Sequence, residues 1–168
     1  MGRKSVKENK NIYQLCRESL DYSRAKAAEK LGWISETRIE NIESGKSSPK
    51  PDEVKAMAEV YHCPELCQNF CAHECEIGKN RVSEVKEESL SQIVLEMLAS
   101  LNKLGKEKDR LIEITADGEI TEDELQDFAA IKNQLKDIAS AVNSLELWIE
   151  KTAIEGKIDS EKLNRLSH

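Results

Sequence analysis

Four cysteines recur at every fourth position in one short stretch of this sequence: Cys63, Cys67, Cys71 and Cys75. On a continuous helix, residues four apart lie on one face at a distance of about 6 Å. Neighbouring thiols could therefore share a metal ion, whereas the first and last would lie about 18 Å apart along the axis. A site that uses all four cysteines requires the helix to break near Ala72 or Glu74.

Three kinds of chemistry fit this repeat. A zinc or iron–sulfur site would use the last three cysteines with Cys63 or His73 as the fourth ligand, although the spacing is not the Cys-x2-Cys of common zinc modules. Alternatively, the thiols oxidise in pairs and make the protein redox-sensitive. They could also be small apolar side chains in a helix seam. The sequence leaves all three open. We expect the fifth cysteine, Cys16, in the core.

The sequence contains no constellation that predicts catalysis. It has no glycine-rich phosphate loop, no His-Glu-x-x-His motif, and no spacing that would assemble a Ser/His/Asp set. Residues 113–124 partly resemble a calcium-binding loop. A turn in which Thr121 caps a helix and Glu124 reaches back explains the same residues. We therefore expect a binding protein and not an enzyme.

The charge is divided unequally along the chain, whose net charge is −7. Residues 1–50 hold 11 Lys and Arg against 7 Asp and Glu, whereas residues 51–168 hold 14 against 25. This mildly basic N-terminal part suits a negatively charged polymer such as a nucleic acid. Its basic lead-in, Arg3, Lys4, Lys7 and Lys10, could follow the phosphates or form a solvated tail. No apolar run is long enough to span a membrane, and the first residues lack a secretory signal. We expect a cytoplasmic protein, in which thiols stay reduced.

Residues 11–61 predict four short helices. Ile12, Leu15 and Cys16 form one apolar stripe over residues 11–20. Ser23 is a good N-cap for a second helix that ends at Gly32, and Ser35 is the cap of a third. A fourth helix begins at Pro51, which is well suited to a first helical position.

This stretch resembles the XRE or Cro/repressor helix-turn-helix family of phage lambda-type regulators. The family pattern has a small residue in the second helix, a glycine at the turn, two aliphatic residues in the recognition helix, an Ile-Glu-x-Gly-Lys sequence and a proline before the fourth helix. The matching residues here are Ala28, Gly32, Ile39, Ile42 to Lys46, and Pro49 or Pro51. The resemblance covers residues 11–66, about a third of the chain.

The resemblance implies that a recognition helix enters the major groove of DNA with its N-terminal residues against base edges. Asn can pair bidentately with adenine, and Glu can accept from the cytosine amino group. Basic and hydroxyl side chains would hold phosphates and fix the register. The implied contact residues are Arg24, Ser35, Glu36, Thr37, Arg38, Glu40, Asn41, Lys46, Ser47, Ser48 and Lys50.

Residues 90–149 carry two apolar stripes that repeat every seven residues. The first consists of Leu90, Val94, Met97, Leu101, Leu104 and Leu111, and the second of Phe128, Ile131, Leu135, Ile138, Val142, Leu145 and Ile149. Two such helices joined by a short turn form an antiparallel coiled-coil hairpin. Leu98, Ile112, Leu147 and Trp148 fall outside this seam and indicate a second contact surface. It could bind the same hairpin of another subunit, the chain's own N-terminal part or a different protein.

Together these patterns predict an all-α protein. Residues 1–78 would form a five-helix, lambda-repressor-like helix-turn-helix domain that includes the cysteine-rich helix, and residues 79–168 a long antiparallel helical hairpin. We expect a homodimeric transcriptional regulator that binds double-stranded DNA sequence-specifically, with a cysteine segment that responds to metal or redox state. The alternative is a protein-interaction adaptor that uses the hairpin and whose helix-turn-helix does not bind DNA.

Overall fold

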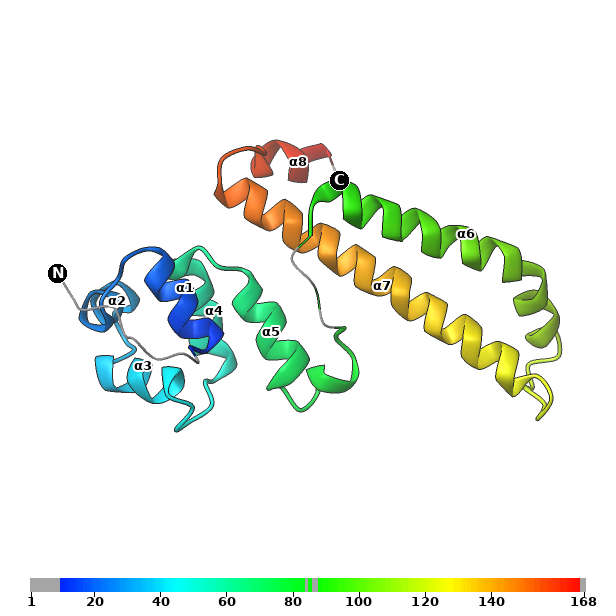
Figure 1. Cartoon of the computed structure of the whole chain (residues 1–168), viewed down its shortest axis with the longest axis horizontal. Helices are drawn as coiled ribbons and strands as arrows, with labels where there is room; N and C mark the ends of the chain where they lie inside the picture. Colours follow the sequence, from blue (N-terminus) through cyan, green and yellow to red (C-terminus); the bar gives the residue numbers. More distant parts are fainter. Residues whose placement is uncertain (1–9, 84, 86–87, 167–168) are drawn as a thin grey trace. The chain divides into compact units, whose positions relative to one another are not determined.

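The computed structural model describes residues 10–83, 85 and 88–166 (Figure 1). Within these residues, helices are the only regular secondary structure, which confirms the all-α prediction. The chain forms two compact units. The first contains residues 1–82 and 150–168, and the second contains residues 83–149. Among the described residues, no helix combines the length and the apolar character that crossing a membrane requires.

Residues 10–82, called the head below, consist of five helices and one 3-10 turn. Their bounds are α1 Ile12–Ser19, α2 Arg24–Leu31, α3 Glu36–Glu43, α4 Pro51–Tyr61, α5 Glu65–His73 and η1 Gly78–Asn80. The predicted caps are confirmed, because the Ser23 hydroxyl accepts from the amide of Lys26 at 3.1 Å and that of Ser35 from the amide of Arg38 at 3.2 Å. Gly32 ends α2 at a φ of +73°, a backbone conformation that favours glycine.

One aliphatic and aromatic core holds the five helices of the head together. Ile39 and Ile42 of α3 are 1% and 2% exposed, and they pack with Ala27 of α2 and with Val54 and Met57 of α4. Burial of a side chain of this size stabilises the fold by about 1.5–3 kcal/mol. The inner side of α3 is therefore fixed by its aliphatic residues, which leaves its polar side exposed.

The hairpin consists of α6 Leu90–Ile114 and α7 Leu125–Ile154, and a short helix, α8 Ser160–Leu166, follows. Gly118, with a φ of +79°, lies in the turn between the long helices. The Glu124 carboxylate accepts from the Thr121 amide at 3.0 Å and from its hydroxyl at 2.7 Å. The predicted return of the Glu124 side chain is confirmed, although the Thr121 hydroxyl donates to Glu124 instead of capping the helix.

The seam between α6 and α7 differs in part from the predicted heptad stripes. Ile93 and Ile114 on α6, and Ile131 and Ala141 on α7, are the buried apolar residues. Five predicted seam residues are instead exposed by 38–48%: Leu90, Val94, Leu101, Leu135 and Val142. The physical reason is that each apolar stripe is wider than the contact that one neighbouring helix can cover.

Candidate nucleic-acid interface

Helix α3 presents a polar surface on the side opposite its buried isoleucines. Ser35, Glu36, Thr37 and Glu40 are exposed, and Asn41 is half-buried. Glu36 lies in the first turn, where the helix dipole favours a negative charge. The side chains that the sequence assigned to base edges thus share one accessible face, which combines hydroxyl and amide groups with two carboxylates.

A buried ion pair fixes the C-terminal end of α3. The Glu43 side chain is 1% exposed, and its carboxylate accepts from Arg17 Nε at 2.6 Å and Arg17 Nη2 at 2.9 Å. Arg24 Nε donates to the same carboxylate at 2.8 Å. Arg17 also donates to the backbone carbonyl of Tyr22. The network joins α3 to α1 and to the start of α2, so two other helices set the position of the recognition helix.

A second network holds the loop between α3 and α4. Arg38 donates through Nε and Nη2 to the Glu53 carboxylate at 2.7 and 2.6 Å. It also donates to Ser47 Oγ at 2.6 Å and to the Ser48 carbonyl at 2.9 Å. Glu53 in turn accepts from the Lys50 amide at 2.7 Å. The hydrogen bond from Arg38 lowers the pKa of Glu53 and raises that of Arg38 itself.

The structure therefore divides the expected phosphate contacts into two groups. Lys46, Lys50 and Ser48 are exposed along the loop and are able to meet a phosphate backbone. Arg24 and Arg38 donate to carboxylates of the head, and Ser47 Oγ accepts from Arg38, so these three partly buried side chains already have partners within the protein. Of the basic lead-in, Lys10 pairs with Glu18 at 2.7 Å, while Arg3, Lys4 and Lys7 lie outside the described residues.

Residues that the sequence reasoning did not single out carry these networks: Arg17, Glu43 and Glu53. Glu43 belongs to the Ile-Glu-x-Gly-Lys pattern, and this pattern was the one sequence feature that could have pointed to its role. A carboxylate beside a core isoleucine in a short helix needs a cationic partner when it is buried. Arg17 is separated from Glu43 by 26 residues and carries no local mark of this role.

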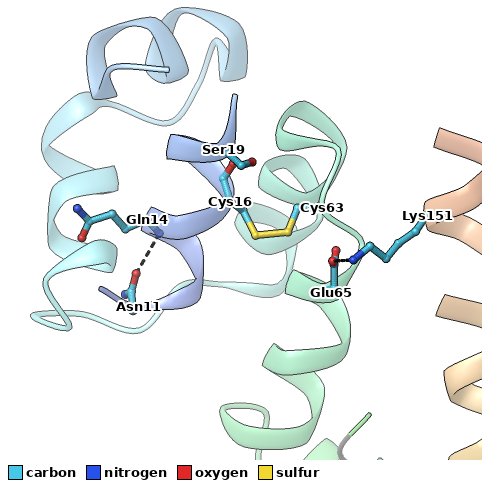
Figure 2. The surroundings of a disulfide bond; sticks show 7 residues. All are labelled: Asn11, Gln14, Cys16, Ser19, Cys63, Glu65 and Lys151. Carbon is cyan, nitrogen blue, oxygen red and sulfur yellow. Dashed lines mark hydrogen bonds and ion pairs between the residues drawn. A yellow bond between two sulfur atoms is a disulfide. The ribbon is translucent and has the colours of Figure 1, made fainter. Parts of the chain in front are cut away.

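The cysteines are arranged differently from the expected quartet. Cys63, after α4, forms a disulfide with Cys16 of α1, with their Cα atoms 6.1 Å apart (Figure 2). Cys67, Cys71 and Cys75 are free thiols, half-buried against the core of the head. In the described part of the chain, no three His, Cys, Asp or Glu side chains converge as a metal site would require. Sequence reasoning placed Cys16 in the core correctly but missed its bond to Cys63.

The helix break expected for the cysteine segment lies at its end. Helix α5 stops at His73, and Glu74 is its C-cap. The Glu74 carboxylate accepts from Tyr13 Oη at 2.7 Å, while Cys75 Sγ accepts weakly from the Gly78 amide at 3.4 Å. Burial raises the pKa of the Cys67 thiol, and the neighbouring Cys71 raises it further. Cys67 is therefore a poor nucleophile at neutral pH, because the thiolate is the reactive form.

A family model described as Helix-turn-helix matches residues 14–66. No curated protein and no solved structure matches the chain. The matched residues extend from α1 into α5 and include the recognition helix α3 with both networks that position it. With this match and this geometry, residues 14–66 form a helix-turn-helix domain of the XRE or Cro/repressor type, which is characteristic of DNA-binding regulators.

Proposed function

We propose that this protein is a transcriptional regulator that binds double-stranded DNA sequence-specifically as a homodimer. The observation that carries the proposal is the exposed polar side of α3, which is positioned by a buried network, Arg17 with Glu43, and a partly buried one, Arg38 with Glu53. A side chain that contacts bases binds best when its helix is held in position before DNA is bound. The two networks hold α3 in this way and use none of its exposed side chains. The exposed lysines of the following loop supply charge for phosphates.

The chemistry of the exposed side of α3 and of the following loop indicates which groups would contact bases and which would contact phosphates. Asn41 can donate to and accept from the edge of adenine, and Glu40 can accept from the cytosine amino group. The two exposed carboxylates of α3, Glu36 and Glu40, repel phosphates, so they favour a DNA site where a donor group on a base meets each of them. Lys46 and Lys50 would contribute affinity without sequence preference.

One experiment separates sequence preference from overall affinity for DNA. A binding site is selected from a random duplex library with the full chain, and the affinity is measured over a range of salt concentrations. We expect a steep loss of affinity with salt. Lys46→Ala should weaken binding to every sequence and reduce the salt slope by about 1, whereas Asn41→Ala should relax the preference at one base pair at a cost of about 1–3 kcal/mol. Binding that is independent of salt and of sequence contradicts the proposal.

The alternative function is a protein-interaction adaptor, and one observation favours it. Glu36 and Glu40 are both exposed on the surface that would face phosphates. Under this alternative, Glu36→Gln and Glu40→Gln would leave DNA binding absent and would weaken a protein contact. Under the proposed function, the same two variants keep DNA binding, and non-specific affinity rises because repulsion from phosphate is removed.

The cysteines support a redox-responsive version of the regulator. A protein that acts on DNA in the cytoplasm works where disulfides are rare and usually transient or regulatory. A dithiol reductant would convert the bond between Cys16 and Cys63 into two thiols and would itself become a disulfide. A metal-responsive version would have to use Cys67, Cys71 and Cys75, and the described residues do not bring these thiols together as a metal site requires. Metal analysis of protein purified without oxygen tests it, and protein free of zinc and iron rejects it.

A further inference from the structure

One side of the helical hairpin exposes apolar side chains that the hairpin leaves uncovered. On α6, the exposed Val94 directly follows the buried Ile93. On α7, the exposed Val142 directly follows the buried Ala141. One residue corresponds to a rotation of about 100° around a helix. The exposed stripe of each helix therefore lies beside the seam and not on the side opposite to it.

Both stripes lie on the same face of the hairpin. The two helices run in opposite directions and face each other, so the same rotational step carries each stripe to the same side. The large residues of this face are exposed by 38–52%: Leu90, Val94, Leu98 and Leu101 on α6, and Leu135 and Val142 on α7. We call these six residues the apolar face. A contiguous apolar patch of this kind marks an interaction surface.

The exposed stripe on α7 is complementary to a second copy of itself that runs in the opposite direction. Its exposed residues are Lys132, Leu135, Ala139, Val142 and Glu146. They follow one another by three, four, three and four residues, with the small alanine in the middle and opposite charges at the two ends. Reversal about Ala139 exchanges Lys132 with Glu146 and brings Leu135 next to Val142.

The register of the hairpin places the same centre on α6. Arg110 Nε donates to Asp127 Oδ2 at 2.7 Å, which sets the two residues at one level. Counting away from this pair along both helices puts Leu98 level with Ala139. The apolar residues of α6 and the stripe of α7 are thus centred on the same point of the face.

We propose that a second copy of this chain covers the apolar face, with α7 packed antiparallel against α7 of its partner about Ala139. The inference deepens the proposed function, because it gives the homodimer its interface. The contact is isologous, so each favourable pairing occurs twice. Lys132 of either copy meets Glu146 of the other, and the alanines at the axis allow the two helices to approach closely.

The charges distinguish this arrangement from the other symmetric one. A two-fold axis along the hairpin would pack α7 against α6 of the partner. Lys132 would then lie opposite the level of Gly105, and Glu146 opposite the level of Ser91, and neither carries a charge. Only the axis across the hairpin gives opposite charges at both ends of the stripe. The stripe matches a second, antiparallel copy of itself, and a partner protein of different sequence would not require this symmetry.

Sedimentation equilibrium of the full chain tests the interface and its register. We expect a dimer for the natural sequence and a monomer with unchanged helical circular dichroism for Val142→Asp. Lys132→Glu places like charges together twice and should weaken the dimer about tenfold, given the small energy of each exposed pair. The double variant Lys132→Glu with Glu146→Lys should restore it. Lys136→Glu, the same change on the outer side of α7, is the matched control and should leave the dimer intact.

A steric pair of variants tests the position of the axis. Ala139→Trp should dissociate the dimer because two bulky rings meet at the centre, whereas Ala129→Trp, at another exposed alanine on the outer side of α7, should not. A natural chain that stays monomeric overturns the inference. A dimer that responds to Lys132→Glu no more than to Lys136→Glu overturns the register.

These outcomes are separate from the test of DNA binding. A monomeric Val142→Asp variant that still binds a DNA duplex with one half-site shows a working head and supports the interface. A natural dimer that binds no DNA leaves the interface supported and rejects the proposed function. A monomeric natural chain that binds a selected DNA site supports the function and overturns the interface.

Discussion

At the scale of single residues, Glu43 determines how firmly the recognition helix is held. Its carboxylate is buried and accepts from both Arg17 and Arg24. Removing one member of a buried ion pair leaves an uncompensated charge, which costs about 3–5 kcal/mol. The same network makes Arg24 a supporting residue in addition to its expected place near phosphate.

We therefore predict that Glu43→Gln lowers the free energy of unfolding by about 3–5 kcal/mol. Urea unfolding followed by circular dichroism measures this change. Glu40→Gln is the control, because Glu40 lies on the same helix but is exposed, and it should change the stability by less than about 0.5 kcal/mol. Equal effects of the two substitutions would show that the buried network does not stabilise the head.

The pair of Arg38 and Glu53 predicts a dependence of stability on pH. The pKa of Glu53 is lowered in the folded state, so its contribution is fully present above the ordinary carboxyl pKa of about 4.3. The contribution is lost as the pH falls from about 5 through the lowered pKa. Urea unfolding between pH 3 and pH 7 should show this loss in the natural chain and a smaller one in Glu53→Gln. Identical slopes in the two proteins would contradict the assignment.

At the scale of elements, the disulfide links α1 to the segment between α4 and α5. It closes a loop with a sequence separation of 47 residues. A cross-link over such a loop stabilises a fold by about 2–4 kcal/mol, chiefly through the unfolded state. The linked helix α1 also carries Arg17, so the cross-link and the support of the recognition helix share one element.

We predict that reduction with dithiothreitol, or the substitution Cys16→Ala, lowers the free energy of unfolding by about 2–4 kcal/mol. Thermal unfolding with and without reductant measures the effect, and Cys67→Ala, which leaves the disulfide intact, should keep the response to reductant. A natural chain that unfolds identically in both conditions would show that the bond contributes nothing in solution.

At the scale of the whole molecule, the proposed dimer supplies two heads to one DNA duplex. Linking two binding modules can raise the affinity about 10²- to 10⁴-fold without a new contact. The hairpin thus affects DNA binding even though it carries none of the expected DNA contacts. The hairpin is acidic, so the positive charge that can bind phosphate is concentrated in the head.

We predict that Val142→Asp weakens binding to a duplex with two half-sites by about 10²-fold or more and leaves binding to one half-site unchanged. Fluorescence anisotropy with the two duplexes measures the difference, with Lys136→Glu as the control for an added negative charge. Equal losses on both duplexes would mean that the substitution damages the head and not the pairing of heads.

The sequence by itself determined where the short helices α2, α3 and α4 begin and where α2 ends. Ser23 and Ser35 cap helices, Gly32 ends one and Pro51 starts one, because capping depends on residues within a single turn. Tertiary structure alone decided the partner of Cys63, since a thiol at one end of a regular repeat gives no local sign of bonding to a cysteine far earlier in the chain. It also decided that Arg38 holds Glu53 and that Val142 lies outside the hairpin seam. Such contacts join positions distant in sequence, and the way the helices pack in three dimensions selects them.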